Sequence, residues 1–488
     1  MYFPSLEEFR EKAKEGNLIP VYREIMADME TPVTAFLKID TGKHSFLLES
    51  VEGGEKWGRY SFLGSNPSII FKCKGNRVTV TRDTASETFE SHDPLSVIKE
   101  LMSRYRPVQL PELPIFFGGA VGFLSYDMVR FFEDIGSRAT DTLKIDDAVF
   151  MITDTLLIFD NLKHRIKVVS NAHIDGNAES AYKDAVARIE AIIERLKAPL
   201  PLMDSKGRGR AEIIPEMTKE AYLEMVRKAK EYIKAGDIIQ VVPSQRFRAE
   251  LTAAPFNIYR ALKLINPSPY MYYLKLDDLT IIGTSPEILV RVEGEDVDVR
   301  PIAGTRRRGK SDEEDRALEY ELLADPKERA EHIMLVDLGR NDIGRISEVG
   351  SVQVTELMTV ERYSHVMHIV SNVRGKLKAG VDSFDVLRAT FPAGTVSGAP
   401  KVRAMEIIEE LEPSRRGPYA GCLGYFGFSG NMDMCITIRT MVIKDNYIYM
   451  QAGGGVVADS DPEAEYQETV NKATALFKAV EMASEGLE

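Results

Sequence analysis

Apolar and polar positions follow different patterns in the two parts of this chain, and the first part is rich in strand patterns. Short runs of Ile, Val, Thr and Phe, bounded by turn-forming residues, predict strands. These runs are residues 33–39, 45–51, 68–72, 77–81, 148–160 and 166–170. A helical apolar period then predicts a helix over residues 178–196, which closes the first part.

The second part mixes long helical patterns with strands that come in adjacent pairs. The helical period predicts helices over residues 218–235, 312–323, 326–338, 400–411 and 462–483. Strands are predicted over residues 270–275, 279–283, 288–292, 434–444 and 447–452. Turns as short as residues 276–278 and 445–446 join neighbouring strands, and turns this short connect antiparallel strands. The predicted fold class is therefore α+β.

Residues 197–216 separate the two parts. Pro, Gly and charged residues dominate this segment and little apolar periodicity runs through it, which is typical of a linker or long loop. The chain of 488 residues is long enough for more than one domain. We therefore divide it into an N-terminal region (residues 1–198), a linker (residues 199–216) and a C-terminal region (residues 217–488).

Composition and charge narrow the class of protein. Apolar residues make up 44% and charged residues 28%, as in globular proteins. No run reaches the roughly 20 apolar residues that cross a bilayer, and the best candidate, residues 148–159, is interrupted by Asp154. The net charge of −13 argues against general binding of nucleic acid. Because Cys73, Cys422 and Cys435 cannot form a disulfide framework, we expect reduced thiols and a cytoplasmic protein.

Two predicted helices each carry a pair of glutamates on a face that also carries apolar residues. Glu465, Glu468 and Lys472 follow each other at helical spacing, and Glu328 and Glu331 repeat the arrangement. Carboxylates on an apolar stripe are costly unless they are paired or bind a metal. Two such pairs would suit Mg²⁺, which takes one or two carboxylates and completes its shell with water and substrate oxygens. On spacing alone, two solvated acidic faces are the favoured alternative.

Residues 304–311 read GTRRRGKS and match the phosphate-binding pattern of nucleotide-hydrolysing enzymes. Two features oppose that function. The arginines crowd a loop whose N–H groups would have to face phosphate, and residues 312–315 place acids at the start of the next helix, where they repel an anion. A phosphate-loop NTPase is therefore the weaker alternative.

Residues 421–424 resemble the nucleophile turn of glutamine amidotransferases, with Cys422 at the reactive position. No histidine follows His368 in the sequence, so a downstream base for this thiol is missing. Cys422 is therefore predicted to be a core residue.

Several other residues are suited to hold an anion. Residues 453–455 are three glycines after a strand and let backbone N–H groups approach a carboxylate, although a flexible turn would have the same sequence. Thr395 precedes a helix and can cap it or contact an anion. Arg439 lies in the apolar run 434–444, where a carboxylate partner is expected.

Together these segments resemble the chorismate-utilising enzymes, and among them the anthranilate synthase large subunits. The resembling strings are GTSPE (283–287), PIAGTRRRG (301–309), AEHIMLVDLGRND (330–342), SHVMHIVS (364–371), FPAGTVSGAPKVRAM (391–405), GCLGYFGFSGNMD (421–433), IRT (438–440), QAGGGVVADSDPEAEYQET (451–469) and NKA (471–473). The resemblance covers nearly the whole chain and is specific, because so many long strings keep one order. It implies large, mostly antiparallel sheets packed as a sandwich with helices outside, and it favours the paired glutamates as metal ligands.

The resemblance also implies a reaction, in which chorismate and ammonia give anthranilate and pyruvate without a redox cofactor. Its catalytic residues would be Glu287, which protonates the leaving ring hydroxyl, His368, which assists the loss of pyruvate, and Glu328, which supports the metal shell. The implied Mg²⁺ ligands are Glu331 and Glu468, supported by Glu465. The residues implied to bind substrate are Thr395, Tyr419, Arg439, Gly453, Gly454, Gly455 and Lys472.

Two positions distinguish members of this family. Isochorismate and salicylate synthases carry a lysine that activates water where this chain has Gln240, an amide that cannot act as a base. Aminodeoxychorismate synthases typically carry a lysine where this chain has Ala303. Attack by ammonia to give anthranilate is therefore the favoured reaction, and these relatives' reactions remain the alternatives.

Regulation and partners are implied in the same way. LLES (47–50) and NPSPYMY (266–272) resemble the tryptophan feedback pocket of the family, in which Ser50, Pro269, Tyr270 and Met271 would contact tryptophan. The alternative for these strings is an ordinary strand end and a proline-rich turn. Because a glutaminase domain is lacking, a separate glutaminase subunit would supply ammonia, in a complex that can pair into a heterotetramer. The implied process is the first committed step of tryptophan biosynthesis, with no nucleic-acid or membrane partner.

Overall fold

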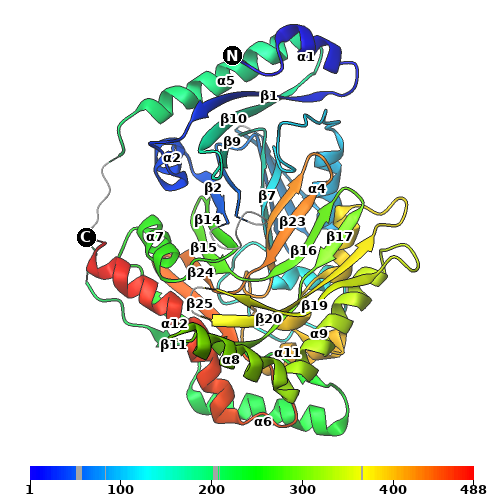
Figure 1. The fold of residues 1–488 in the computed structure, drawn as a ribbon, viewed down its shortest axis with the longest axis vertical. Coiled ribbons are helices and arrows are strands. Elements are labelled where there is room, and N and C mark those ends of the chain that lie inside the picture. Colours follow the sequence, from blue (N-terminus) through cyan, green and yellow to red (C-terminus); the bar gives the residue numbers. More distant parts are fainter. Residues whose placement is uncertain (51–57, 83, 202–206, 208, 364–365, 488) are drawn as a thin grey trace.

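Two large sheets dominate the computed structural model, which describes residues 1–50, 58–82, 84–201, 207, 209–363 and 366–487 (Figure 1). Within these residues, the strands of the eleven-stranded sheet are, in spatial order, β1 (Leu18–Met26), β10 (Arg165–His173), β9 (Thr155–Asp160), β3 (Tyr60–Ser65), β2 (His44–Glu49), β14 (Tyr270–Leu276), β15 (Leu279–Ser285), β24 (Thr440–Lys444), β25 (Tyr447–Gly453), β13 (Ser244–Glu250) and β11 (Ile214–Pro215).

The twelve-stranded sheet faces the first. Its strands are β18 (Ile302–Arg307), β20 (Val366–Lys376), β17 (Asp296–Val299), β16 (Ile288–Glu293), β23 (Met432–Ile436), β22 (Cys422–Gly427), β7 (Gly119–Leu124), β8 (Ala148–Thr153), β4 (Ile69–Lys74), β5 (Arg77–Arg82) and β6 (Ala85–Glu90), with β19 (Gln353–Arg362) paired to β20. A small pair, β12 (Gln240–Val241) and β21 (Gly398–Ala399), lies beside them. Neighbouring strands such as β14 and β15 run antiparallel, as predicted.

Side chains of both sheets fill the space between them. Phe46 and Tyr272 of the eleven-stranded sheet share one buried cluster with Phe123 and Leu423 of the twelve-stranded sheet. Strand β8 shows why both faces are apolar: Val149 and Met151 point into this inter-sheet core, while Phe150 and its alternate neighbours join a second cluster under helices. The predicted α+β sandwich is therefore confirmed.

Helices cover the outer faces. The eleven-stranded sheet packs against α1 (Leu6–Lys12), α2 (Pro32–Ile39), α5 (Ala178–Lys197), α7 (Pro255–Ile265) and α12 (Pro462–Glu485). The twelve-stranded sheet packs against α4 (Pro94–Ser103), the 3-10 helix η1 (Tyr126–Phe131), α9 (Pro326–Gly344) and α10 (Ser383–Thr390). Helices α6 (Lys219–Ala235) and α11 (Lys401–Leu411) enclose a smaller core around β12, and α8 (Asp312–Ala324) lies on β18 and β20.

Each long helix predicted from the sequence is present, but two predicted strands are each two strands. Residues 148–160 form β8 and β9, and residues 434–444 fall in β23 and β24. In both cases the first strand belongs to the twelve-stranded sheet and the second to the eleven-stranded sheet. The apolar pattern runs on because both sheets are covered on both faces, so it gives no signal where the chain changes sheets.

The predicted strand over residues 33–39 is wrong, because this segment is helix α2. Thr31 caps the helix, its side chain accepting from Thr34 N while Thr34 Oγ1 accepts from Thr31 N, and Pro32 occupies the first turn. Ala35, Phe36 and Ile39 are buried at helical spacing. The capping residues outweigh the β-branched content of the run.

Both sheets contain strands from each side of the predicted linker. Residues 202–206 and 208 lie outside the described residues, and Ile214–Pro215 at the end of the linker forms edge strand β11 against β13. The division into residues 1–198 and 217–488 stays a prediction. None of the described helices has both the length and the apolar composition of a membrane span.

We predict that Phe123→Ala lowers the free energy of unfolding by about 3–5 kcal/mol, because it leaves a cavity between the sheets. Phe123 is completely buried in the inter-sheet core. Urea unfolding followed by circular dichroism measures the change. The control Val349→Ala, at a fully exposed position, should change this free energy by less than about 0.5 kcal/mol. Equal effects of the two substitutions would contradict the packing described here.

Candidate active site

Two crossings between the sheets place an acid and a cation at one spot. Strand β15 ends at Ser285 in one sheet, and β16 begins at Ile288 in the other, with Glu287 between them. Arg439 lies in the corresponding gap between β23 and β24. The crossings are joined by backbone hydrogen bonds, from Ile436 N to Glu287 O (3.0 Å) and from Thr284 N to Arg439 O (3.1 Å).

The sequence predicted that Arg439 lies inside a strand. In the structure it lies between β23 and β24 instead. Its φ of 52° is in the left-handed region, which side-chain-bearing residues rarely adopt. No carboxylate of the described residues lies within ion-pairing distance of its guanidinium, and burial lowers the pKa of Arg439 below its usual value. The expected carboxylate partner is thus missing from the part of the chain that the structure describes.

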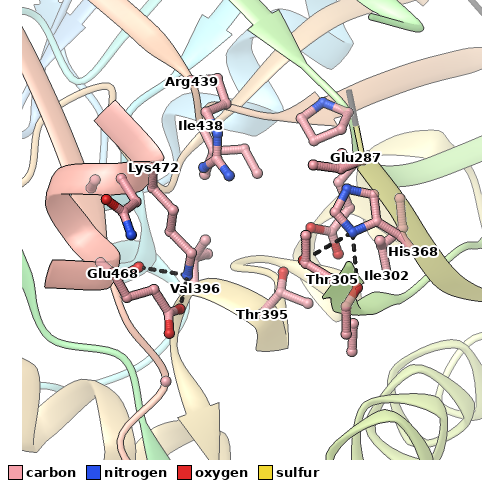
Figure 2. A pocket seen from close by; sticks show the side chains of 18 of the residues that line it. Glu287, Ile302, Thr305, His368, Thr395, Val396, Ile438, Arg439, Glu468 and Lys472 are labelled. Atoms are coloured by element: carbon pink, nitrogen blue, oxygen red, sulfur yellow. Dashed lines mark hydrogen bonds and ion pairs between the residues drawn. The ribbon is translucent and has the colours of Figure 1, made fainter. Parts of the chain in front are cut away.

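A cavity of about 790 Å³ opens at this crossing. It is lined by twelve of the thirteen residues predicted for catalysis, substrate binding and metal binding: Glu287, Glu328, Glu331, His368, Thr395, Tyr419, Arg439, Gly453, Gly455, Glu465, Glu468 and Lys472. Figure 2 shows Glu287 and His368 on one side of the cavity, Lys472 and Glu468 on the other, and Thr395 between them. The residues predicted from the sequence thus line one cavity. The role of each residue stays a prediction.

Glu287 is an acid that stays protonated near neutral pH. Burial raises its pKa to about 8, although the Thr395 side chain, the Ile302 backbone and the more distant charge of Arg439 act in the opposite direction. The Glu287 side chain is buried at the cavity wall. A carboxylic acid in this state can donate a proton to a leaving group.

His368 is held in one tautomer by its neighbours. Its Nδ1 lies 2.9 Å from Gly304 O and 3.1 Å from Thr305 Oγ1. Because a carbonyl oxygen only accepts, Nδ1 carries the proton and Nε2 is left as the basic nitrogen. Burial, aided by the charge of Arg439, lowers the pKa of His368, so the ring is neutral at physiological pH.

The four glutamates of α9 and α12 have different surroundings. Glu331 Oε1 accepts from Gln240 Nε2 at 2.9 Å, and Glu468 pairs with Lys472 Nζ at 2.6 Å. Lys472 also donates to a backbone carbonyl of the glycine run at 2.9 Å. Glu328 is held by Arg306, which binds it at 3.1 Å.

Glu465 has a carboxylate oxygen without a hydrogen-bond donor among the described residues. It is buried, and no described residue donates to its Oε2. Burial first, and the neighbouring Glu468 as well, raise the pKa of Glu465. Burial likewise raises the pKa of Glu331, with Glu328 and Glu468 adding to the effect. A positive charge between these helices would offset the burial of these carboxylates and the repulsion between them.

The acids do not form a ready-made metal centre. Among the described residues, no group of three or more His, Cys, Asp or Glu side chains is arranged to hold a metal ion. A hard cation such as Mg²⁺ takes one or two carboxylates and obtains its other oxygens from substrate and water. The acidic side chains on α9 and α12 suit Mg²⁺ in that sense.

The three glycines form a fixed surface instead of a flexible turn. A Cβ at Gly453 would lie 2.8 Å from Tyr419 Oη, and one at Gly455 would lie 2.5 Å from Gln240 Nε2. Gly454 is the predicted residue that does not line the cavity: its N–H donates to Pro243 O at 3.2 Å. Only glycine leaves enough room for these packed neighbours.

Tyr419 supplies a hydroxyl to the same wall. The residue lines the cavity, and its hydroxyl lies against Gly453. Burial raises the pKa of Tyr419 to about 12, so the phenol keeps its proton and can donate it in a hydrogen bond.

The structure excludes both misleading motifs. In the phosphate-like loop, Gly309 N donates to Asp315 (2.7 Å) and Lys310 N donates to Glu314 (2.6 Å), so these N–H groups are not free for phosphate. Cys422 is buried in β22, and burial raises the pKa of its thiol well above the usual range. It is a core residue, as predicted.

The residues predicted to bind tryptophan come together at a strand pair. Met271 of β14 lies opposite the last residue of β2, Glu49, and Ser50 follows directly. Tyr270 donates to Asp433 at 2.8 Å. Pro269 follows Pro267 and Ser268, which line the main cavity. Tryptophan binding at these residues stays a prediction.

Sequence reasoning missed several cavity residues. Asn471, Ala475 and Lys478 lie on the same side of α12 as Glu468, and Lys327 lies beside Glu328 on α9. Counted from Glu468, their spacings of three, seven and ten residues keep to one face of α12, and this was the signal that would have found the first three. Thr305, which contacts His368, carries no comparable signal.

Comparison with known proteins identifies the family of this chain. The model of a family described as chorismate binding enzyme matches residues 44–478. Anthranilate synthase component 1 of Acetivibrio thermocellus is 51% identical over 99% of this chain and 100% of its own length, and that of Aquifex aeolicus is 50% identical over 99% of both. The crystal structure of anthranilate synthase component I from Streptococcus pneumoniae matches with a TM-score of 0.79 at 40% identity, covering 93% of this chain and 99% of that one. This chain therefore belongs to the family of chorismate-binding enzymes.

Proposed function

We propose that this chain is the large subunit of an anthranilate synthase, which converts chorismate and ammonia to anthranilate, pyruvate and water. The observation that carries the proposal is the Arg439 guanidinium, which faces the cavity without a carboxylate partner among the described residues and lies opposite the neutral acid Glu287. The names of relatives that match this chain over nearly its full length support the same function.

Chorismate carries two carboxylates, and the cavity offers two places for them. Arg439 and the Tyr419 hydroxyl would bind the enolpyruvyl carboxylate, because a guanidinium and a phenol both donate to an anion. The ring carboxylate would lie at the glycines 453–455, near Lys472. Thr395, between the two sides of the cavity, would fix the ring. Binding at both ends orients the ring carbons toward Glu287 and His368.

In the first step, ammonia forms a bond to the ring carbon beside the carboxylate-bearing carbon, and the C–O bond of the ring hydroxyl breaks. Glu287 donates its proton to the departing oxygen, which leaves as water. The nitrogen then releases a proton. A charged glutamate could not donate that proton, so the raised pKa of Glu287 serves this step.

In the second step, the ring carbon that bears nitrogen loses its proton, and the C–O bond to the enolpyruvyl group breaks. The released three-carbon group gains a proton and becomes pyruvate, while the ring becomes aromatic. His368 would serve this proton exchange, since its neutral imidazole has a basic Nε2.

Mg²⁺ would be held by Glu331 and Glu468, with Glu328 and Glu465 supporting them, and would withdraw charge through the ring carboxylate. The unsatisfied Oε2 of Glu465 and the raised pKa of Glu331 support this assignment. The glutamates lie on the two helices that border the cavity, α9 and α12.

Gln240 favours ammonia over water as the nucleophile. Its side chain is buried and donates to Glu331, and an amide has no basic lone pair with which to activate water. Ala303, also at the cavity, cannot form a covalent intermediate. These two residues disfavour the isochorismate, salicylate and aminodeoxychorismate synthase reactions.

Partners and regulation complete the proposal. The designation component 1 in the relatives' names is consistent with a separate glutaminase subunit, which would supply ammonia from glutamine. Tryptophan would bind at Ser50, Pro269, Tyr270 and Met271 and inhibit the enzyme. The reaction belongs to aromatic amino-acid biosynthesis.

The purified chain, given chorismate, Mg²⁺ and an ammonium salt, should form fluorescent anthranilate, and EDTA should stop the reaction. Glutamine should replace ammonium only when a glutaminase subunit is added. Glu468→Gln should lower the rate at least about 100-fold, because a proposed metal ligand is lost. The control Glu463→Gln, on the same helix but paired with Lys219 at the surface, should keep the rate. Isochorismate, salicylate or an aminochorismate as the main product would refute the assignment.

The rate should depend on pH through Glu287. Its raised pKa means that the acid form is present below about pH 8 and is lost above it, so kcat should fall as pH rises through that value. The assay holds the concentration of unprotonated ammonia constant at each pH. Glu287→Gln should cost about 100- to 10,000-fold in kcat, because the amide has no acidic proton.

Glu293 provides the matched control for that experiment. Desolvation also raises its pKa, but its largely exposed side chain lies at the end of β16 and does not line the cavity. Glu293→Gln should leave both kcat and the pH profile as they are. An unchanged alkaline limb in Glu287→Gln would mean that another group supplies the proton.

Ser50→Leu should weaken inhibition by tryptophan, because the larger side chain would occupy space beside Met271. We expect the tryptophan concentration that halves the rate to rise at least about tenfold, a binding loss of about 1.4 kcal/mol. Lys43→Leu, near the other end of β2 and exposed, is the control and should retain the wild-type response. Inhibition of Ser50→Leu at the wild-type concentration would place the tryptophan site elsewhere.

A further inference from the structure

A buried ion pair lies directly behind the wall of the cavity. Glu412 and Arg416 follow helix α11, and their side chains are only 4% and 2% exposed. The pair is bidentate: Arg416 Nε donates to Glu412 Oε2 at 3.0 Å, and Nη2 donates to Oε1 at 2.7 Å. Neither residue lines the cavity, and neither has a role in the chemistry proposed above.

The remaining N–H groups of Arg416 reach the backbone of two cavity-lining residues. Nη1 donates to Val396 O at 2.7 Å, and Nη2 donates to Val242 O at 2.6 Å. Val396 directly follows Thr395, the residue that lies between the two sides of the cavity in Figure 2. One guanidinium therefore fixes two separate segments of the wall.

The carboxylate of Glu412 contacts a further residue near the cavity wall, Ser244. Its Oε1 accepts from both the backbone N and the hydroxyl of Ser244, each at 2.8 Å. Ser244 begins β13 and lies opposite Gly453 in the sheet. Glu412 therefore holds the start of the strand beside the glycines, two residues after Val242 in the same segment.

Arg416 also packs on the tyrosine that we propose to bind substrate. Its Cζ lies 5.5 Å from the ring centroid of Tyr419 and 4.7 Å from that of Tyr126. Cation–π contacts of this kind orient the ring as well as stabilise it. Tyr419 in turn places its hydroxyl against Gly453.

We propose that Arg416, together with Glu412, is a positioning residue for chorismate: the pair sets the spacing of Val242, Val396 and Tyr419 and thereby the fit of the cavity to the substrate. This proposal rests on the proposed binding of chorismate. A lysine could not replace Arg416, because one ammonium cannot reach a carboxylate and two carbonyls in the planar geometry of a guanidinium. An ion pair that merely stabilised the fold would not affect substrate binding in a folded variant.

The test compares Glu412→Gln and Arg416→Lys with a matched control in α11, the helix that directly precedes the pair. Glu409, one turn earlier, is also buried and pairs with Arg130 at 2.6 Å, but neither residue of that pair contacts the cavity. Glu409→Gln thus removes the same charge from a similar pair. Thermal unfolding identifies the variants that are folded, and the double variant Glu412→Met/Arg416→Met removes both charges where single ones prevent folding.

Two measurements are made on each folded variant: the KM for chorismate and for ammonium in the anthranilate assay, and the Kd of chorismate by calorimetry. We expect Glu412→Gln, Arg416→Lys and the double variant to raise the KM and the Kd of chorismate at least about tenfold, with the KM of ammonium unchanged. Glu409→Gln should leave all three values unchanged.

Wild-type KM and Kd for chorismate in these folded variants would overturn the proposal, as would loss of folding in every variant, which would make the pair a stabilising element only. Failure of the proposed function has a different signature. In that case the wild-type chain binds chorismate but releases a product other than anthranilate, and the calorimetric comparison still decides the role of Arg416.

Discussion

The site depends on the two backbone hydrogen bonds that join the sheet crossings. Consecutive strands on either side of Glu287 and of Arg439 belong to different sheets, so the chain must leave one sheet and enter the other at these points. The bonds from Ile436 N and Thr284 N tie the crossings together. The acid and the cation are therefore placed by the two largest elements of the fold, and side-chain packing only adjusts them. Sites built on such rigid elements hold their geometry better than sites on loops.

Burial then sets the charge of each group in a chain that is acidic overall. Glu287 is neutral because desolvation outweighs the cations near it, and the pKa values of Glu331 and Glu465 are raised in the same way. Arg439 is a buried cation that has no carboxylate partner among the described residues. A dianionic substrate with a divalent cation would satisfy both needs at once. The charges that line the cavity are thus unbalanced in a way that matches the proposed ligands.

The sequence predicted most of the site but less of its framework. Helical spacing marked the paired glutamates, and the family strings brought Glu287, His368 and Arg439 into one site, because strings of this length preserve local structure. The crossings were missed: the runs 148–160 and 434–444 stay apolar where the chain changes sheets, and nothing local distinguishes one long strand from two. The β-branched residues of 33–39 indicate a strand, but the cap at Thr31 makes the segment helix α2. The role proposed for Arg416 depends on contacts with distant segments, such as Val242, which no local pattern shows.

The proposed choice of ammonia as nucleophile is argued from how Gln240 is held. Its amide donates to Glu331, a carboxylate on the helix proposed to bind the metal, and a Cβ at Gly455 would lie only 2.5 Å from its Nε2. A lysine at this position would form an ion pair with Glu331, and it would need a neutral amine to act as a base toward water. The hydrogen bond from the amide opposes the rise in the pKa of Glu331 that burial causes, and the amide brings no competing cation, so the carboxylate would remain available to the proposed metal ion. Because ammonia is itself a nucleophile, it needs no base from this position. The same hydrogen bond would therefore serve the proposed metal binding and would leave water without activation.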